Sequence, residues 1–404
     1  MKRIIALILC LLFLSGCSVS TDEQKETTEP PPVSNNDEYV RAIWLPYYDL
    51  QKFIQGCNEK KFTENIDNAF KELADMGFNT VTVQVRPCAD AFYKSSVFPS
   101  SRYCFDKQGA DMPYDPLKIM CDSAEKYKLK IEAWINPYRV SQDNDIDALS
   151  NDNIAKKWYK DDKTKSRVYV TKDKIFFNPA SEEVIKLIVK GVAEIVENYN
   201  VSAIHFDDYF YPVTSEDIDK KEYEKYQSDG GKLKLGDYRR ARVSLMVKRV
   251  YEKIKSINKN VRFGISPAAS MKNDYNNLYA DVEKWVTEDG YIDYICPQVY
   301  FGFKNVYQPF MFTVKKWMYI TSCDMYVGLP LYKAGKADKY AAKEDEQAIN
   351  EFVSNNNIIA RQITYLSKLD KIKGFYVFSY GSLKDSDCQQ EVKNMIAVMN
   401  NSNH

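Results

Sequence analysis

From residue 40 onward, short apolar runs alternate with amphipathic segments. The runs number eight and are rich in β-branched and aromatic residues, while the segments between them repeat apolar residues every three or four positions. This alternation predicts parallel strands that alternate with helices. The predicted strands are Arg41–Leu45, Thr80–Arg86, Lys130–Asn136, Ala203–Asp208, Arg262–Ser266, Tyr294–Tyr300, Tyr326–Leu331 and Gly374–Ser379.

The sequence also indicates where the predicted helices begin and end. In the first, apolar residues from Ile66 to Met76 lie three and four positions apart, with Thr63 as the expected N-cap and Gly77 as the end. The other predicted helices are Asp115–Tyr127, Ser181–Tyr199, Asp237–Ile257 and Glu344–Leu369.

The links between elements indicate which architecture these strands form. The strand-to-helix links Pro87–Tyr114, Pro137–Ala180 and Tyr209–Gly236 are long, whereas a helix-to-strand return such as Gly77–Asn79 is short. In a parallel barrel every strand-to-helix link lies on the C-terminal face, where active sites are built. We therefore expect an α/β fold over residues 40–400, a TIM-like (β/α)8 barrel with long strand-to-helix loops on its C-terminal face.

A doubly wound open sheet is the main alternative. That fold binds nucleotides through a glycine-rich turn after its first strand, and here the first strand runs into Trp44-Leu45-Pro46-Tyr47. The absence of glycine at this turn favours the barrel.

The N-terminus has the layout of a secretory signal. Lys2 and Arg3 precede the apolar run Ile4–Leu14, which is shorter than the roughly 20 residues of a membrane span. The run ends in Leu14-Ser15-Gly16-Cys17, which resembles the lipobox of bacterial lipoproteins. An ordinary secretory signal with an incidental cysteine is the alternative.

We accordingly expect three regions along the chain. Residues 1–16 are a lipoprotein signal peptide, residues 17–39 are a lipidated Cys17 and a disordered tether rich in Ser, Thr, Glu and Pro, and residues 40–400 are the barrel. Such a protein is an extracytoplasmic, membrane-anchored lipoprotein of the bacterial cell envelope.

Composition removes several classes of function. The 404 residues contain 56 Lys plus Arg and 56 Asp plus Glu, so no net charge attracts nucleic acid. The two histidines are His205 and the terminal His404, which excludes a zinc site with several imidazoles. The seven cysteines from Cys57 to Cys388 are odd in number and contain no CxxC pair, so we expect free thiols. We expect no metal and no cofactor.

Strand alternation predicts which side chains face the barrel interior. In the second strand Val81, Val83 and Val85 face the helices, so the intervening polar residues face inward. The same rule in four strands gives an inward polar set comprising Thr82, Gln84, Arg86, Glu132, Trp134, Asn136, His205, Asp207, Gln298 and Tyr300.

Two adjacent acids end the fourth predicted strand. Asp207 faces inward and is the first candidate for nucleophile or base, and Asp208 leans toward the loop as acid, orienter or cap. Glu132 is a third candidate acid. The alternatives are a turn with an Asp cap for the pair, and a structural carboxylate paired with Arg86 or Arg139 for Glu132.

Aromatic and polar residues at the predicted strand ends suit a sugar, because flat rings stack on pyranose faces while amides and guanidinium groups bind hydroxyls. The aromatic candidates are Trp44, Trp134, Tyr138, Tyr209, Tyr211 and Tyr300. The polar candidates are Arg86, Asn136, Arg139, His205 and Gln298.

Taken in order, these motifs resemble those of the glycosyl-hydrolase-like bacterial lipoproteins related to the divisome-localised glycosyl hydrolase. The resemblance covers about residues 40–385 and is carried by Arg41–Leu45, Gln84–Pro87, Asp90–Tyr93, Ala133–Arg139, His205–Pro212, Phe263–Pro267 and Pro297–Tyr300. It implies a TIM-like barrel and a hydrolase that acts on glycan, which in the best-understood relatives is peptidoglycan stripped of its stem peptides.

The chain departs from the family pattern at two places. Pro99 is followed by Ser100 where the family usually has a Trp, and Glu132 stands where members often carry His. The sequence Asp237-Tyr238-Arg239-Arg240 also resembles a family pattern, although an N-cap with a basic helix face explains it equally well.

The sequence therefore predicts a glycoside hydrolase with Asp207 and Asp208 at the reacting centre, acting on an amino-sugar polymer such as peptidoglycan glycan. Retaining, inverting and substrate-assisted mechanisms stay open. The alternatives are an inactive barrel that binds cell-wall glycan and a glycosidase of another polysaccharide.

Overall fold

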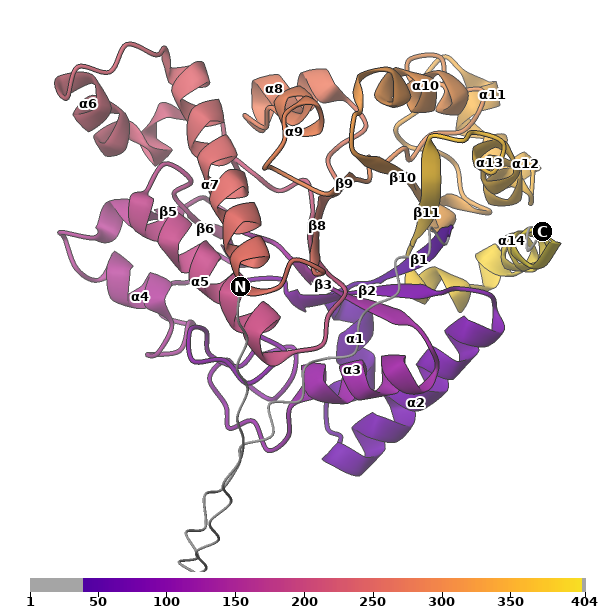
Figure 1. The fold of residues 1–404 in the computed structure, drawn as a ribbon, viewed down its shortest axis with the longest axis horizontal. Coiled ribbons are helices and arrows are strands. Elements are labelled where there is room, and N and C mark those ends of the chain that lie inside the picture. Colours follow the sequence, from indigo (N-terminus) through magenta and orange to yellow (C-terminus); the bar gives the residue numbers. More distant parts are fainter. Residues whose placement is uncertain (1–38, 402–404) are drawn as a thin grey trace, which may run out of the picture. The chain divides into compact units, whose positions relative to one another are not determined.

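Eight parallel strands close into a barrel whose spatial order follows the chain (Figure 1). The computed structural model describes residues 39–401, so the signal peptide, Cys17 and nearly all of the tether lie outside the described residues. The barrel strands are β1 (Val40–Leu45), β2 (Thr80–Arg86), β3 (Lys130–Ile135), β7 (Ala203–Phe206), β8 (Arg262–Ile265), β9 (Tyr294–Ile295), β10 (Asp324–Leu329) and β11 (Ile372–Phe378). The expected TIM-like barrel is confirmed.

Helices surround the ring of strands (Figure 1). They are α1 (Tyr47–Ile54), α2 (Glu59–Asp75), α3 (Pro116–Lys126), α4 (Ile154–Tyr159), α5 (Glu182–Asn198), α6 (Lys220–Ser228), α7 (Leu235–Ile257), α8 (Met271–Asn277), α9 (Val282–Thr287), α10 (Phe310–Ile320), α11 (Glu346–Ile349), α12 (Glu351–Ser354), α13 (Ile358–Leu366) and α14 (Gln389–Asn401). Within residues 39–401, no helix is both long and apolar enough to cross a membrane.

The long links after the strands carry structure of their own. The link between β3 and α5 contains α4 and a three-stranded antiparallel sheet of β4 (Arg139–Ser141), β6 (Ile175–Phe177) and β5 (Val168–Val170). The sequence predicted the length of this link but not its sheet. Because such links lie on the C-terminal face, they build the walls above the barrel mouth.

Side chains of the strands separate into two layers, as the alternation predicts. Residues such as Val81, Val83 and Ile204 belong to the large apolar core between strands and helices. Trp44 and Tyr294 belong to a second cluster inside the barrel. The seven cysteines within the described residues are free thiols, as expected.

Three predicted element boundaries are wrong for identifiable reasons. The sixth strand ends at Ile295, because Pro297 has no N–H with which to continue the ladder. Helix α2 begins at Glu59 with Asn58 as its N-cap, and the Thr63 hydroxyl bonds within the helix. The predicted helix Glu344–Leu369 is divided into α11, α12 and α13, interrupted by asparagines that favour turns.

A close approach inside the barrel makes one glycine irreplaceable. Gly264 in β8 pairs with Tyr294 in β9, and a Cβ at this glycine would lie 2.0 Å from atoms of the Tyr294 ring. The ring cannot yield easily, because its hydroxyl bonds His205 at 3.0 Å. Glycine at position 264 therefore leaves space for the Tyr294 ring inside the barrel.

We expect Gly264→Ala to lower the free energy of unfolding by about 1–3 kcal/mol through overpacking against Tyr294. The measurement is chemical denaturation followed by tryptophan fluorescence. Gly236→Ala is the matched control, because its Cβ would meet the flexible end of Arg240 at 3.3 Å. Equal stability of the two variants would contradict the overpacking argument.

Candidate active site

A cavity of about 280 Å³ opens at the carboxyl ends of the barrel strands. Its lining residues come from the ends of β1, β2, β3, β7, β8, β9 and β11 and from the adjoining links. They are Trp44, Tyr47, Tyr48, Gln84, Trp134, Arg139, Gln142, Asp207, Asp208, Tyr209, Ser266, Gln298, Tyr300 and Phe378. Eight of the residues predicted for the site line this cavity: Trp44, Trp134, Arg139, Asp207, Asp208, Tyr209, Gln298 and Tyr300.

Asp207 follows β7 directly and is surrounded by hydrogen-bond donors. Its carboxylate accepts hydrogen bonds from Trp134 Nε1 (3.0 Å), from Asn136 Nδ2 (3.2 Å to each oxygen) and from the Tyr209 amide (3.3 Å). Burial raises the pKa of Asp207, while the positive charge of Arg139 and these donors oppose the rise. The donors and Arg139 thus offset part of the effect of burial on the Asp207 carboxyl.

Asn136 does not line the cavity but fixes the position of Asp207. Its side-chain oxygen accepts the Arg139 amide (2.9 Å), which leaves its nitrogen to donate to Asp207. The Arg139 guanidinium donates from Nε to the Pro87 carbonyl (2.8 Å) and lies 5.0 Å from the centre of the Tyr209 ring. Strand β3 and the residues after it therefore hold both the acid and the cation beside it.

Asp208 has different surroundings. Burial and the neighbouring Asp207 carboxylate raise the pKa of Asp208 to about 7. A hydrogen bond from Gln298 and the positive charge of Arg139 lower this pKa but do not cancel the rise. This carboxyl therefore titrates close to neutral pH, far above an ordinary aspartate. Two adjacent acids with distinct environments are suited to distinct roles, one as a charged group and one as a proton donor.

The link that carries both acids is held by a buried ion pair. Arg239 of α7 donates to Asp219 from Nε (2.8 Å) and Nη2 (2.7 Å), and both side chains are fully buried. Arg239 also donates to the carbonyls of Thr214 (3.0 Å) and Ser215 (2.7 Å). The N-terminal part of α7 thus holds the link from β7, a role that the sequence did not reveal.

The interpretation of the Asp237-Tyr238-Arg239-Arg240 segment as an N-cap is wrong. Helix α7 begins at Leu235, and Asp237 lies inside the first turn, where it pairs with Arg240 at 2.7 Å.

Aromatic rings form the rim of the cavity. Tyr48 and Tyr209 are 44% and 49% exposed, which leaves their faces available to a ligand. Phe378 lies 6.0 Å from both Trp44 and Tyr300, centre to centre. A polar floor with an aromatic rim suits a sugar ring, which has both hydroxyls and apolar C–H faces.

Arg86 was predicted to face the site, and the structure contradicts this placement. The pairing of β2 with β3 shifts by one residue after Gln84, so that Arg86 lies opposite Ile135, which faces the helices. The Arg86 guanidinium lies 4.8 Å from the centre of the Phe98 ring, and its nitrogens have no hydrogen-bond partner among residues 39–401. Burial lowers the pKa of Arg86 to about 10.

Glu132 was predicted as a possible third acid, but it lies below the cavity. It accepts hydrogen bonds from Thr82 Oγ1 (2.7 Å) and from the Tyr376 hydroxyl (2.8 Å) inside the barrel. Burial raises the pKa of Glu132, and the hydrogen bonds from both hydroxyls oppose this rise. The alternative, a structural carboxylate in the barrel, agrees with these contacts, but its partners are the two hydroxyls and not Arg86 or Arg139.

His205 also lies in the barrel interior and does not line the cavity. Trp44 Nε1 donates to its Nε2 (3.3 Å), so the ring proton is on Nδ1, which lies 3.0 Å from the Tyr294 hydroxyl. Burial lowers the pKa of His205 to about 3. The neutral ring therefore supports Trp44 from below rather than binding substrate.

Tyr138 and Tyr211, two further predicted aromatics, are buried outside the cavity. The Tyr211 hydroxyl donates to Asp219 (3.0 Å), and Tyr138 is enclosed in the core. The half-buried Tyr47 and the exposed Tyr48 line the cavity instead, together with Gln142, Ser266 and Phe378. Ser266 and Phe378 lie at strand ends that the sequence did predict, so position alone could have identified them.

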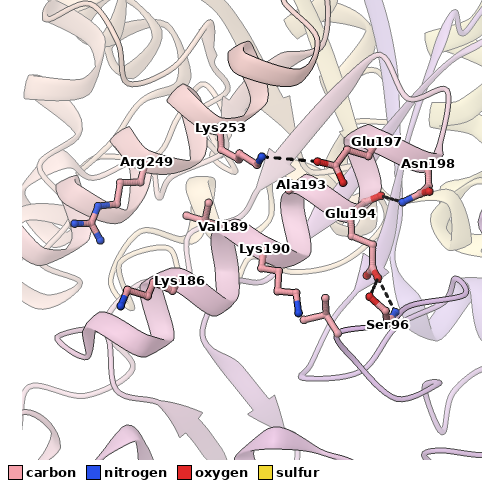
Figure 2. A pocket seen from close by; sticks show the side chains of 11 residues that line it. Ser96, Lys186, Val189, Lys190, Ala193, Glu194, Glu197, Asn198, Arg249 and Lys253 are labelled. Carbon is pink, nitrogen blue, oxygen red and sulfur yellow. Dashed lines mark hydrogen bonds and ion pairs between the residues drawn. The ribbon is translucent and has the colours of Figure 1, made fainter.

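A larger hollow of about 480 Å³ lies on the outer side of the barrel between α5 and α7 (Figure 2). Three of its cations are already paired, Lys186 with Glu183 (3.0 Å), Lys253 with Glu197 (3.7 Å) and Arg249 with Glu182. Its other carboxylate, Glu194, accepts hydrogen bonds from Ser96. Because most of its charges are paired and it lies away from the strand ends, we place the reacting centre at the barrel mouth.

The described residues contain no group of three or more His, Cys, Asp or Glu side chains arranged to hold a metal ion.

Comparison with known proteins gives consistent matches. Residues 39–345 match the family described as glycosyl hydrolase-like 10. Glycosyl hydrolase YngK of Bacillus subtilis (strain 168) is 31% identical over 382 residues, which cover 87% of this chain and 69% of that protein. Glycosyl hydrolase DigH of Escherichia coli O6:H1 (strain CFT073) is 29% identical over 432 aligned residues, covering 97% of this chain and 95% of that protein.

Among solved structures, the glycoside hydrolase domain of PgaB (BpsB) from Bordetella bronchiseptica is similar, with a TM-score of 0.57 and 11% sequence identity. The likeness covers 88% of this chain and 98% of that one. At this identity it shows a shared fold.

We expect Trp134→Phe to raise the pKa of Asp207, because the variant loses the indole donor to its carboxylate. A hydrogen bond to a charged group contributes about 1.5–3 kcal/mol, enough for a measurable rise. The measurement is a carboxyl ¹³C NMR titration of Asp207. Trp158→Phe, in α4 and away from the cavity, is the matched control, and a rise of the same size in the control would contradict the assignment.

Proposed function

The chain belongs to the glycosyl hydrolase-like 10 family and is a glycoside hydrolase, and on that premise we propose that it cleaves the glycan strands of peptidoglycan in the cell envelope. The observation that carries the proposal is the pair Asp207 and Asp208 in an aromatic-rimmed cavity at the mouth of the barrel. Glycosidic bonds are cleaved by two carboxyl groups, one that donates a proton and one that acts at the anomeric carbon.

The two acids take these roles according to their surroundings. Asp208, with its pKa raised to about 7, donates its proton to the glycosidic oxygen as the C–O bond breaks. Asp207, held by three donor groups, acts as a carboxylate on the anomeric carbon, as nucleophile or as base for a water molecule. The anomeric configuration of the first product, read by ¹H NMR, distinguishes these two actions.

An amino-sugar polymer fits the polar groups of the cavity. Gln84 uses its Oε1 to accept the Tyr47 amide (3.2 Å), so its N–H donors have no partner among the described residues. Gln298 and Gln142 add further amides to the lining. Side-chain amides can bind acetamido and hydroxyl groups alike, and the rings of Tyr48 and Tyr209 can stack on neighbouring sugars.

We also propose that a lipid on Cys17 anchors the protein to the membrane. Support comes from the basic start, the apolar run and the Ser15-Gly16-Cys17 ending, all outside the described residues. The 22 residues Ser18–Tyr39 would reach at most about 75 Å when extended, which lets an anchored barrel contact glycan near the membrane.

We expect Asp207→Asn and Asp208→Asn each to reduce cleavage of peptidoglycan glycan by about 10³-fold or more while glycan binding is retained. Products released from intact and peptide-stripped strands are identified by mass spectrometry. The control is Asp173→Asn, which changes a carboxylate in an exposed turn. Retained binding without any product from the wild type would support the binding barrel, and release from another polysaccharide alone would contradict the peptidoglycan substrate.

Replacement of the proposed anchor gives a separate test. In cells, Cys17→Ser should move the protein from the membrane fraction to the soluble fraction, because no acyl chain can be attached. Cys57→Ser serves as the control, since Cys57 lies in the barrel region. A Cys17→Ser protein that stays in the membrane fraction would contradict lipidation at this residue.

A further inference from the structure

The link between β10 and α11, residues 330–345, carries a tyrosine that is almost fully open to solvent. Tyr340 is 75% exposed, whereas Lys333 and Asp338 of the same link are buried. Because the link follows a barrel strand, it lies on the C-terminal face, where the cavity opens. Single exposed aromatic residues are common on protein surfaces, so the contacts between this link and the cavity decide what Tyr340 can do.

A buried ion pair holds the link against the wall of the cavity. Lys333 Nζ donates to Asp338 Oδ1 (2.8 Å) and to the carbonyl of Tyr300 (2.7 Å), a residue that lines the cavity. The same Asp338 oxygen accepts the Tyr340 amide (3.0 Å). Separation of this pair would leave a buried charge uncompensated, which is costly. The backbone of Tyr340 is therefore fastened to the site through one carboxylate and one ammonium group.

The same ammonium group covers one face of the Tyr340 ring. Lys333 Nζ lies over the ring, 5.4 Å from its centre, which is a cation–π contact. Since most of the residue is exposed, the opposite face of the ring is open to solvent. An open aromatic face held in place beside the cavity is a surface on which a pyranose ring can stack.

Aromatic side chains continue from the cavity onto this link. The half-buried Tyr332 has its ring centre 5.9 Å from that of Tyr300 and 5.9 Å from that of Phe378, both of which line the cavity. The rim of the cavity therefore extends outward along the link that carries Tyr340. Tyr340 itself is not among the residues that line the cavity, so a ligand that contacts both must be a chain of several sugars.

We propose that Tyr340 is a distal sugar-binding residue, which stacks on a pyranose of the bound glycan strand outside the cavity and away from the bond that is cleaved. The inference rests on the proposed function, because its ligand is the same glycan strand. Lys333 and Asp338 are positioning residues, which order the ring before the strand binds and so reduce the entropy lost on binding.

The test compares Tyr340→Ala with the wild type on peptide-stripped peptidoglycan strands separated by length. On long strands we expect kcat/KM to fall by about 3–10-fold, through a higher KM, because the ring binds substrate and transition state equally. On the shortest strands that the wild type cleaves, kcat/KM should be unchanged, since these do not extend beyond the cavity. Tyr340→Phe keeps the ring and should stay within about twofold of the wild type.

Tyr319→Ala is the matched control. Tyr319 is 91% exposed and lies near the end of α10, from which the chain returns to β10 on the opposite face of the barrel. Its removal should leave kcat/KM unchanged on strands of every length. Equal activity of Tyr340→Ala and the wild type on long strands would overturn the inference and leave the proposed function intact, and an equal loss on short and long strands would also overturn it.

A binding measurement separates this inference from cleavage. In the full chain carrying Asp207→Asn, the affinity for long peptide-stripped strands, measured by isothermal titration calorimetry, should fall by about 3–10-fold when Tyr340→Ala is added. Such a loss, if the wild type does not cleave the strands, would support the inference and contradict the proposed activity alone. Strands that the chain neither binds nor cleaves would overturn both.

Discussion

Three hydrogen-bond donor groups converge on the carboxylate of Asp207, and the rest of the site depends on them. Burial raises the pKa of this carboxyl, and the indole of Trp134, the amide of Asn136 and a backbone N–H oppose that rise. Burial and the Asp207 carboxylate together raise the pKa of Asp208, whose surroundings lack the cluster of donors found around Asp207. Two chemically identical side chains thereby have different electrostatic surroundings.

Two polar side chains inside the barrel lie below this arrangement. One is a histidine ring that carries no charge, and the other is a carboxyl group that two hydroxyls bind. The neutral ring of His205 accepts the indole N–H of Trp44, and Glu132 is bound by Thr82 and Tyr376. These contacts fill the barrel below the mouth and fix the rings above it. The candidate site lies one layer higher, where links of variable length supply the remaining walls.

Much of this could be read from the sequence, since alternation and spacing specify strands, helices and the face on which the links gather. All eight strands lie where the pattern placed them, and the acids after β7 are in the cavity. Local pattern could not foresee the shift after Gln84, which turns Arg86 outward, because strand register depends on the neighbouring strand. Nor could it distinguish Tyr48, on the rim, from Tyr211, whose burial is decided by Asp219 and α7.

The ion pair between Arg239 and Asp219 has a consequence for the thermodynamics of binding. It fixes the segment Thr214–Asp219 to α7 through several hydrogen bonds, so the loop that follows Asp207 and Asp208 is held in place without a ligand. Little conformational entropy is then lost there when a sugar chain enters the cleft, and more of the contact energy becomes affinity. The loop behaves as preorganised scaffold, which leaves the exposed rim tyrosines as the adaptable part of the site.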